Sequence, residues 1–290
     1  MPTGVEEPAT TPPSQVVSTE RPRSPPSRSP ALRYFVEIGE SRYFWIHLSL
    51  SDLRARWRRS FLGAVWSLIQ PLAMTGLLAF VFGRVFHVDT ATYAPFIFSG
   101  MILWEYIVST ATGGSLSFVQ ADAYIKQARR PLAIYPLRTA LTNLCVLGFA
   151  SIGLVGWVLL AGLGTFGWTW LAAPLVYPIA LGLGWTLATF LAYFATRFRD
   201  IPHALGLVLQ VAWFVSPVYF EPKLFRDAGL NALVDANPIY HYMQIVRAPL
   251  LHGEWPTTAD FAYSLGTIGA LACLAALAGR HMERRIIFYL

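Results

Sequence analysis

The fold is decided by the stretch Ser51–Phe86, SDLRARWRRSFLGAVWSLIQPLAMTGLLAFVFGRVF. Four arginines stand in the six residues from Arg54 to Arg59, and no charged residue follows from Ser60 to Gly83. These 24 uncharged residues form a helix of about 36 Å at ~1.5 Å per residue, which crosses a hydrocarbon layer about 30 Å thick. Because basic residues beside a span are translocated poorly, the arginines are expected on the cytoplasmic side. The stretch is therefore a membrane span that orients the rest of the chain.

The composition agrees with a membrane protein. Of the 290 residues, 55% are hydrophobic and 13% are charged, and the mean hydropathy is +0.47, whereas soluble domains carry about 25% charged residues. The net charge of +6 is compatible with an acidic partner, but the basic residues gather beside apolar runs, where membrane topology explains them. Nucleic acid is therefore not an expected partner. Cys145 and Cys273 lie in apolar runs and imply no disulfide framework.

The chain before the first span has two parts. Residues 1–30 contain eight prolines among Ser, Thr and Arg and are predicted to be a disordered cytoplasmic tail, because they cannot bury enough apolar surface. Residues 31–59 are predicted to form an amphipathic helix in the cytoplasmic interface, with a hinge near Gly39. Its apolar stripe consists of residues at spacings of three and four, namely Tyr43, Ile46, Leu50, Leu53 and Trp57.

Residues 60–290 are predicted to form an all-α membrane domain with six transmembrane helices and short external helices before the last one. The expected spans are Ser60–Gly83, Tyr93–Phe118, two in the uncharged run Thr139–Thr196 around a turn at Gly162–Gly167, Ile201–Phe220 and Phe261–Gly279. The segment Glu221–Asp260 is expected outside, with a helix at Pro238–Leu251. From Ala31 onward, fourteen basic residues fall in the predicted inside segments and four in the outside ones, which are Arg84, Lys223, Arg226 and Arg247. This bias places both termini in the cytoplasm.

The sequence lacks motifs for catalysis and nucleotide binding. It has no G-x-x-x-x-G-K-[ST], no G-x-S-x-G and no H-E-x-x-H, and its six histidines are too scattered for a metal site. ATP hydrolysis is therefore not expected in this chain, and neither catalytic residues nor a bound cofactor or metal is predicted.

Four stretches resemble one transporter family. They are Arg56–Pro71 (RWRRSFLGAVWSLIQP), Tyr124–Pro136 (YIKQARRPLAIYP), Arg197–Ile201 (RFRDI) with Ser216–Tyr219 (SPVY), and Asn237–Gly253 (NPIYHYMQIVRAPLLHG). In their order and spacing they are similar to the permease subunit of bacterial type-2 ABC exporters for polysaccharides, the family of O-antigen and teichoic acid export. The chain departs from the family pattern at Arg130, where Phe usually precedes the proline, at Asp122, where Asn is frequent, and at Glu105 just after Trp104.

The resemblance implies a homodimeric pore in the bacterial cytoplasmic (inner) membrane. Two copies of a separate nucleotide-binding ATPase subunit, which would hold ATP and Mg, would drive a lipid-linked glycan outward. Two other functions stay open: a type-2 permease for a small lipid or drug, and a membrane-bound transferase.

Polar and aromatic residues in the spans are candidates for the substrate channel, because sugar faces stack on rings while their hydroxyls meet polar groups. These candidates are Trp66, Gln70, Trp104, Glu105, Tyr106, Gln210, Trp213 and Tyr219. The alternative is that the rings form interface belts or pack in the core. Three interpretations of Glu105 stay open: a hydrogen bond to glycan hydroxyls, a brace to a neighbouring helix, or a place near the external mouth.

Charged residues on the cytoplasmic side are candidates for contact with the ATPase. Between the second and third spans they are Asp122, Lys126, Arg129 and Arg130, and on the helix before the first span they are Arg54 and Arg58. The alternative is that these residues act only as topological anchors.

Overall fold

The computed structural model describes residues 30–58, 63–127, 130–162, 167–283 and 286, and every structural statement below refers to these residues. Residues 1–29 of the predicted tail and Arg129 lie outside them. The described chain consists of helices and their connections, with no strand. The α-helices are α1 (Pro30–Glu40), α2 (Arg42–Arg58), α3 (Trp66–Phe86), α4 (Thr90–Ser115), α5 (Ser117–Gln120), α6 (Asp122–Gln127), α7 (Ile134–Leu160), α8 (Val176–Arg197), α9 (Ile201–Val215), α10 (Pro222–Asp227), α11 (Asn231–Asp235), α12 (Pro238–Arg247) and α13 (Thr258–Met282).

Five helical segments of the described chain are long and apolar enough to cross a membrane. They are Trp66–Val85, Thr90–Ser115, Ile134–Leu160, Trp168–Arg197 and Thr258–Met282. The fourth begins with a 3₁₀ segment, Trp168–Leu175, before α8. The helix in the place of the predicted fifth span, α9, is apolar but has only 15 residues, and the chain leaves it at Ser216. Six apolar helices are therefore present, one of them short.

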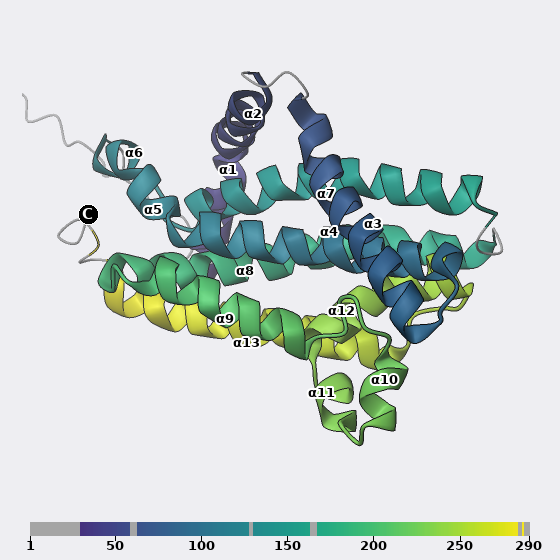
Figure 1. Cartoon of the computed structure of the whole chain (residues 1–290). Helices are drawn as coiled ribbons and strands as arrows, with labels where there is room; N and C mark the ends of the chain where they lie inside the picture. Colours follow the sequence, from purple (N-terminus) through teal and green to yellow (C-terminus); the bar gives the residue numbers. More distant parts are fainter. Residues whose placement is uncertain (1–29, 59–62, 128–129, 163–166, 284–285, 287–290) are drawn as a thin grey trace, which may run out of the picture.

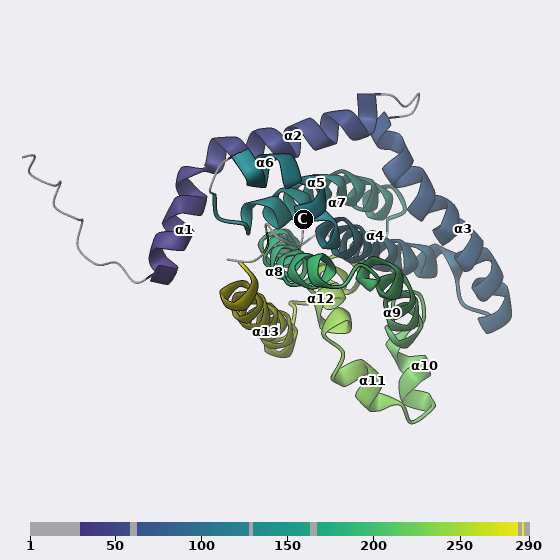
Figure 2. The same ribbon diagram turned by 90° about the vertical axis from the view of Figure 1, so that its left-hand side faces the viewer.

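Helix α4 lies at the centre of the bundle (Figure 2). It packs against α3, α7, α8, α9 and α12, and most of its residues are buried. A helix that is apolar on all sides is expected to be enclosed in this way. Its contact with α8 is close because Gly114 has no side chain: a Cβ there would lie 2.4 Å from the Cβ of Ala188. Small residues at such crossings let helix backbones approach within a membrane.

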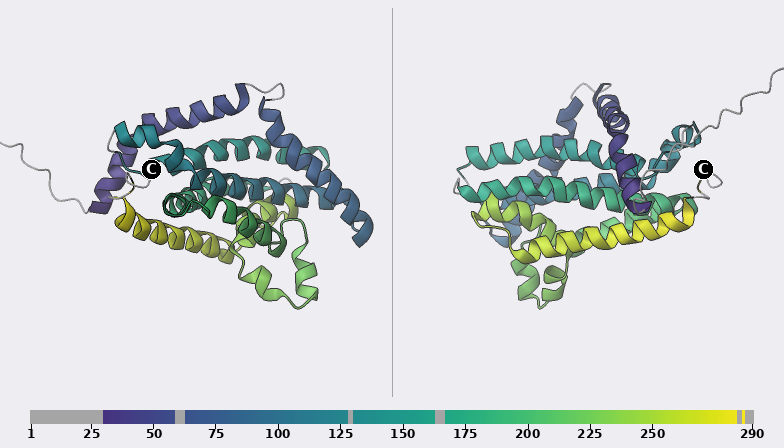
Figure 3. Two further views of the ribbon diagram at one scale, coloured as in Figure 1. Left: turned by 60° about the vertical axis from the view of Figure 1, so that its left-hand side comes forward. Right: turned by 180° about the vertical axis from the view of Figure 1, so that it is seen from behind.

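Among the other long helices, α3, α7 and α8 pack on α4, and α13 packs on α8. Helices α7, α8 and α13 run side by side (Figures 1 and 3). Their ends nearest α5 and α6 define what we call the arginine-rich end of the bundle, because Arg130, Arg197 and Arg280 lie there. The turn between α7 and α8 is at the opposite end, where Gly162 adopts a left-handed φ of 64°, as predicted for a glycine turn.

Helices α1 and α2 lie outside the bundle at the arginine-rich end, and the chain bends between them at Ser41, close to the hinge predicted near Gly39. Helix α2 packs on α7, where the Ser49 hydroxyl donates to the Arg138 carbonyl at 3.2 Å. Three members of the predicted apolar stripe, Tyr43, Ile46 and Leu50, are exposed, whereas Leu53 and Trp57 are partly buried. The first half of the stripe is therefore free to lie in a membrane interface, and that location stays a prediction.

The predicted external segment differs from an ordinary loop. Helices α10 and α11 lie at the surface, but α12 packs against α13 and α4, and a π-helical turn, Ala248–His252, follows it. Arg247, which the topology count placed in an outside segment, is 0% exposed. Its side of the membrane stays a prediction, while its burial could not be predicted because the polar composition of the segment hides one buried face of α12.

Arg247 joins three separate parts of the chain. Its guanidinium donates to the carbonyl oxygens of Pro217 (2.8 Å), Val218 (2.6 Å) and Phe96 (3.2 Å), and its Nε donates to the Ser99 hydroxyl at 3.2 Å. It also lies 3.7 Å from the centroid of the Phe96 ring, a cation–π distance. Its partners are dipoles and a ring, with no carboxylate among them. The residue therefore fixes α12 to α4 and to the turn that follows α9.

We expect Arg247→Met to destabilise the protein by about 3 kcal/mol or more, because the three buried carbonyl oxygens would each lose the donor that Arg247 supplies. Arg247→Lys keeps the charge but cannot reach all four acceptors, so an intermediate loss is expected. The measurement is thermal unfolding of the purified protein.

The matched control is Arg226→Met, which breaks the exposed 2.8 Å ion pair with Asp235 and should cost at most about 1 kcal/mol. Equal melting temperatures for the Arg247→Met and Arg226→Met variants would contradict the role given to Arg247.

Candidate functional site

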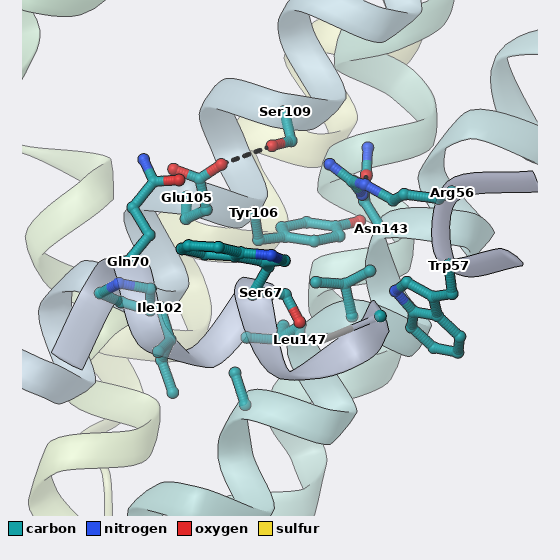
Figure 4. A pocket seen from close by; sticks show the side chains of 15 residues that line it. Arg56, Trp57, Ser67, Gln70, Ile102, Glu105, Tyr106, Ser109, Asn143 and Leu147 are labelled. Atoms are coloured by element: carbon teal, nitrogen blue, oxygen red, sulfur yellow. Dashed lines mark hydrogen bonds between the residues drawn. The ribbon is translucent and has the colours of Figure 1, made fainter. Parts of the chain in front are cut away.

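A pocket of about 230 Å³ lies between α2, α3, α4 and α7 (Figure 4). Its polar or charged lining residues are Arg56, Ser67, Gln70, Glu105, Ser109 and Asn143, and its aromatic ones are Trp57, Trp66 and Tyr106. Figure 4 shows Gln70 and Glu105 on one side of the pocket and Arg56 with Trp57 on the other. The pocket therefore offers ring faces, neutral hydrogen-bonding groups, one basic group and one acidic group.

Helix α4 supplies one polar wall of the pocket. The Ser109 hydroxyl donates to Glu105 Oε1 at 2.8 Å, one helical turn away (Figure 4). A carboxylate at this depth of a span is costly unless it faces protein or water, and Glu105 is partly buried and lines the pocket. One of its oxygens has a protein partner, so the carboxylate retains capacity to accept further hydrogen bonds.

A chain of hydrogen bonds crosses the pocket from α2 to α4. Arg56 Nη1 donates to Asn143 Oδ1 at 3.3 Å, and Asn143 Nδ2 donates to the Thr110 hydroxyl at 3.2 Å. The Tyr106 hydroxyl donates to the Ala180 carbonyl on α8 at 2.7 Å, which holds the ring against the pocket. These contacts give the polar lining a defined geometry before any ligand arrives.

The eight predicted channel residues do not form one group. Four of them, Trp66, Gln70, Glu105 and Tyr106, line this pocket. Trp104 is buried in the core without lining the pocket, and Gln210 is exposed on α9. A role for these two residues in the channel stays a prediction.

Trp213 and Tyr219 belong to an aromatic cluster near the end of α9, away from the pocket. The Tyr219 ring lies 5.2 Å from Trp213, 4.2 Å from Phe220 and 5.8 Å from Phe82 of α3, measured between centroids. The Tyr93 hydroxyl donates to the Tyr219 carbonyl at 2.6 Å. Tyr219 is buried, so in this structure its ring packs against other rings.

The position of Glu105 along α4 bears on its three interpretations. Helix α4 begins at Thr90, three residues before the predicted start, which places Glu105 about 22 Å along the helix at ~1.5 Å per residue. It shares the pocket with Arg56 of α2, on the side of the arginine-rich end. The contact with Ser109 and the open pocket agree with a residue that faces protein or a cavity, and all three interpretations stay predictions.

Among the predicted coupling residues that the structure describes, Asp122 and Lys126 lie on α6 and Arg130 lies in the connection that follows it, at the arginine-rich end. On α6, Lys126 Nζ and Asp122 Oδ1 are 2.8 Å apart. The Arg130 guanidinium lies 4.4 Å from the Phe44 ring of α2, and Phe44 meets the Tyr124 ring of α6 at 6.0 Å. Helix α6 and the first half of α2 therefore form one surface, which we call the α2–α6 surface. Arg54 and Arg58 are exposed further along α2.

Sequence reasoning missed the ion pair between Arg138 and Asp52. Both guanidinium nitrogens Nε and Nη2 donate to the carboxylate, in a bidentate arrangement that joins α7 to α2. The two residues stand 86 positions apart, so no local pattern links them. Asn143 was missed as well, although a single amide within an uncharged run is a signal for a buried polar contact. Among the described residues, no group of His, Cys, Asp and Glu is arranged to hold a metal ion.

Comparisons with known proteins agree on one family. The profile of the ABC-2 type transporter family matches residues 44–251. The chain is 27% identical over 249 residues to the O-antigen export system permease protein RfbA of Myxococcus xanthus, which covers 84% of this chain and 94% of that protein. It is 24% identical to an RfbA of Klebsiella pneumoniae, over 65% of this chain and 72% of that one.

A polysaccharide transporter is also similar. The polysialic acid transport protein KpsM of Escherichia coli is 21% identical over 71% of this chain and 80% of its own length. The family match spans most of α2 through α12 and contains every residue that lines the pocket. On this evidence the chain belongs to the ABC-2 type transporter family.

Proposed function

We propose that this chain is the permease half of an ATP-driven exporter that moves a lipid-linked polysaccharide, such as an O-antigen, a teichoic acid or a related cell-surface glycan. It would lie in the bacterial cytoplasmic membrane with both termini inside, and a separate ATPase subunit would bind ATP and Mg. The names of the relatives support the substrate class. The lack of a phosphate-binding loop in the sequence supports the assignment of ATP hydrolysis to a separate subunit.

The observation that carries the proposal is the mixed lining of the pocket. Trp57, Trp66 and Tyr106 present rings, while Gln70 and Glu105 present hydrogen-bonding groups. Sugars have apolar C–H faces and polar edges, so a surface with both kinds of group suits them. Glu105 is the only acidic residue among those that line the pocket, and a transferase that needs paired acids would lack its second one there.

The pocket also supports a homodimer. At about 230 Å³ it is smaller than the ~300–1,000 Å³ sites that enclose drug-sized ligands, so a polysaccharide needs a wider passage. Both α3 and α9 expose apolar side chains beside the pocket and the aromatic cluster, including Leu77, Phe80, Leu207 and Val211. A second copy of the chain against these helices would enlarge the pocket into a channel.

We expect Glu105→Ala to lower glycan export several-fold while leaving the amount of permease and its complex with the ATPase unchanged. Glu105→Gln keeps the shape and most hydrogen-bonding capacity and should retain most export. Trp66→Ala should reduce export of long chains through the loss of a stacking surface. Export is measured as surface glycan in cells that contain the variant as their only permease.

Trp168→Ala is the matched control for Trp66, because Trp168 is 83% exposed at the opposite end of the bundle. Parental export by Trp66→Ala and Glu105→Ala would remove the pocket from the pathway. Export of a small lipid or drug, with no dependence on glycan synthesis, would instead support the alternative permease.

The α2–α6 surface is the proposed contact with the ATPase. Lys126→Asp should weaken co-purification of the ATPase and lower export, because it reverses a charge that is exposed on this surface. The double variant Asp122→Lys with Lys126→Asp restores an ion pair within α6 but leaves the charge reversed at position 126.

If the ATPase makes an electrostatic contact with the positive charge at position 126, the double variant stays defective. If Lys126 only stabilises α6, the double variant recovers, and the docking proposal fails. Arg226→Asp, at the opposite end of the bundle, is the control for insertion and expression.

A further inference from the structure

A second hollow lies outside the bundle and has no lining residue in common with the pocket of the candidate site. It is a groove of about 330 Å³ between α1, α8 and α13. Its walls are Phe35 of α1, Trp185 and Thr189 of α8, and a row of small residues on α13, Ala272, Ala275, Ala276 and Gly279. Figure 3 shows α1 crossing α8 toward the carboxyl end of α13. We call this hollow the α1–α13 groove.

The length of the α1–α13 groove along α13 is close to the thickness of one membrane leaflet. From Ala272 to the end of α13 at Met282 is ten residues, or about 15 Å along the helix, half of a hydrocarbon layer about 30 Å thick. The α13 wall leaves room because its side chains are methyl groups or hydrogen. The groove is open toward the outside of a membrane-spanning segment, where the surrounding molecules are lipids.

One end of the groove is polar and carries both charges. Arg280 and Glu283 line it at the carboxyl end of α13 together with the Tyr34 hydroxyl of α1. Arg280 is exposed and Glu283 is partly buried, and no ion pair involves either of them within the part of the chain that the structure describes. Burial raises the pKa of the Glu283 carboxyl, and a cation beside it would oppose that shift.

The Tyr34 hydroxyl is prepared to donate. It accepts from the Ala133 backbone N–H at 3.2 Å, which leaves its own O–H available as a donor. Burial raises the pKa of Tyr34 to about 12, so the hydroxyl keeps its proton at neutral pH. Together the polar end offers donors from Tyr34 and Arg280 and an acceptor from Glu283.

We propose that the α1–α13 groove binds one aminophospholipid, with a primary ammonium and a phosphate in its headgroup, from the leaflet at the arginine-rich end. The ammonium meets Glu283, the phosphate meets Arg280 and Tyr34, and an acyl chain lies along Ala272 and Ala276. This assignment is independent of the transported substrate, because the groove is separate from the proposed channel.

Charge complementarity selects this lipid among common ones. An anionic headgroup without an amine, such as phosphatidylglycerol, satisfies Arg280 but leaves the Glu283 carboxylate without a cation. A choline headgroup has a positive charge but no N–H to donate to the carboxylate. Phosphatidylethanolamine supplies both the phosphate and an N–H donor.

The test is native mass spectrometry of the purified full-length chain with equal amounts of phosphatidylethanolamine, phosphatidylcholine and phosphatidylglycerol. We expect the parental chain to retain phosphatidylethanolamine at least fivefold over the other two lipids. Glu283→Gln should remove this preference. Ala276→Trp fills the groove and should lower retention of all three lipids. The matched control is Ala270→Trp, at an exposed alanine of α13 that does not line the groove, and it should behave as the parental chain.

Equal retention of phosphatidylethanolamine and phosphatidylglycerol by the parental chain would overturn the proposal, as would an unchanged preference in Glu283→Gln. Glu283→Gln is a conservative change near the helix end, so the test survives if Ala276→Trp fails to fold. Displacement of phosphatidylethanolamine by an equal amount of polyprenyl phosphate would assign the groove to a lipid carrier and overturn it. Loss of dimers in Ala276→Trp with bound lipid unchanged would assign the groove to a second copy of the chain and would also overturn the lipid proposal.

Discussion

The enclosure of α4 by other helices is the constraint on which the structure depends. In a membrane core a polar group has no water to bind, so each one on this helix needs a protein partner or a hydrated cavity. Ser99 meets that need through Arg247, Thr110 through Asn143, and Glu105 through Ser109 and the pocket. The polar residues of α4 thus determine where α12, α7 and the open space must lie.

The long spans could be predicted because length and lack of charge decide them. An uncharged run of 58 residues from Thr139 to Thr196 exceeds one span, and a glycine-rich turn divides it where α7 ends. That Glu105 faces protein or a cavity could also be predicted, since a carboxylate in a span must avoid lipid. Its contact with Ser109 follows from their spacing of four residues on one helix.

The pairings between distant segments could not be predicted in the same way. The side of α12 that is buried depends on how the helix is rotated against α4, so the composition of its segment concealed Arg247. Asp52 and Arg138 lie on different helices whose crossing point no local pattern reveals. Likewise, Trp66 and Trp213 are similar residues in similar spans, and only the arrangement of α3 and α9 places one at the pocket and the other in an aromatic cluster.

The short length of α9 has a consequence for the bilayer beside it. Fifteen residues cover about 22 Å, roughly 8 Å less than the hydrocarbon thickness. The non-helical turn at Ser216–Tyr219 is buried in protein, so its backbone avoids lipid. The apolar surface that α9 presents to lipid is nevertheless shorter than the hydrocarbon layer is thick. A bilayer next to this face must thin, at a cost of fractions of a kcal/mol for each ångström of mismatch. A protein neighbour with an equally short apolar helix relieves this hydrophobic mismatch by replacing the lipid there. The α9 helix of a second copy has that length.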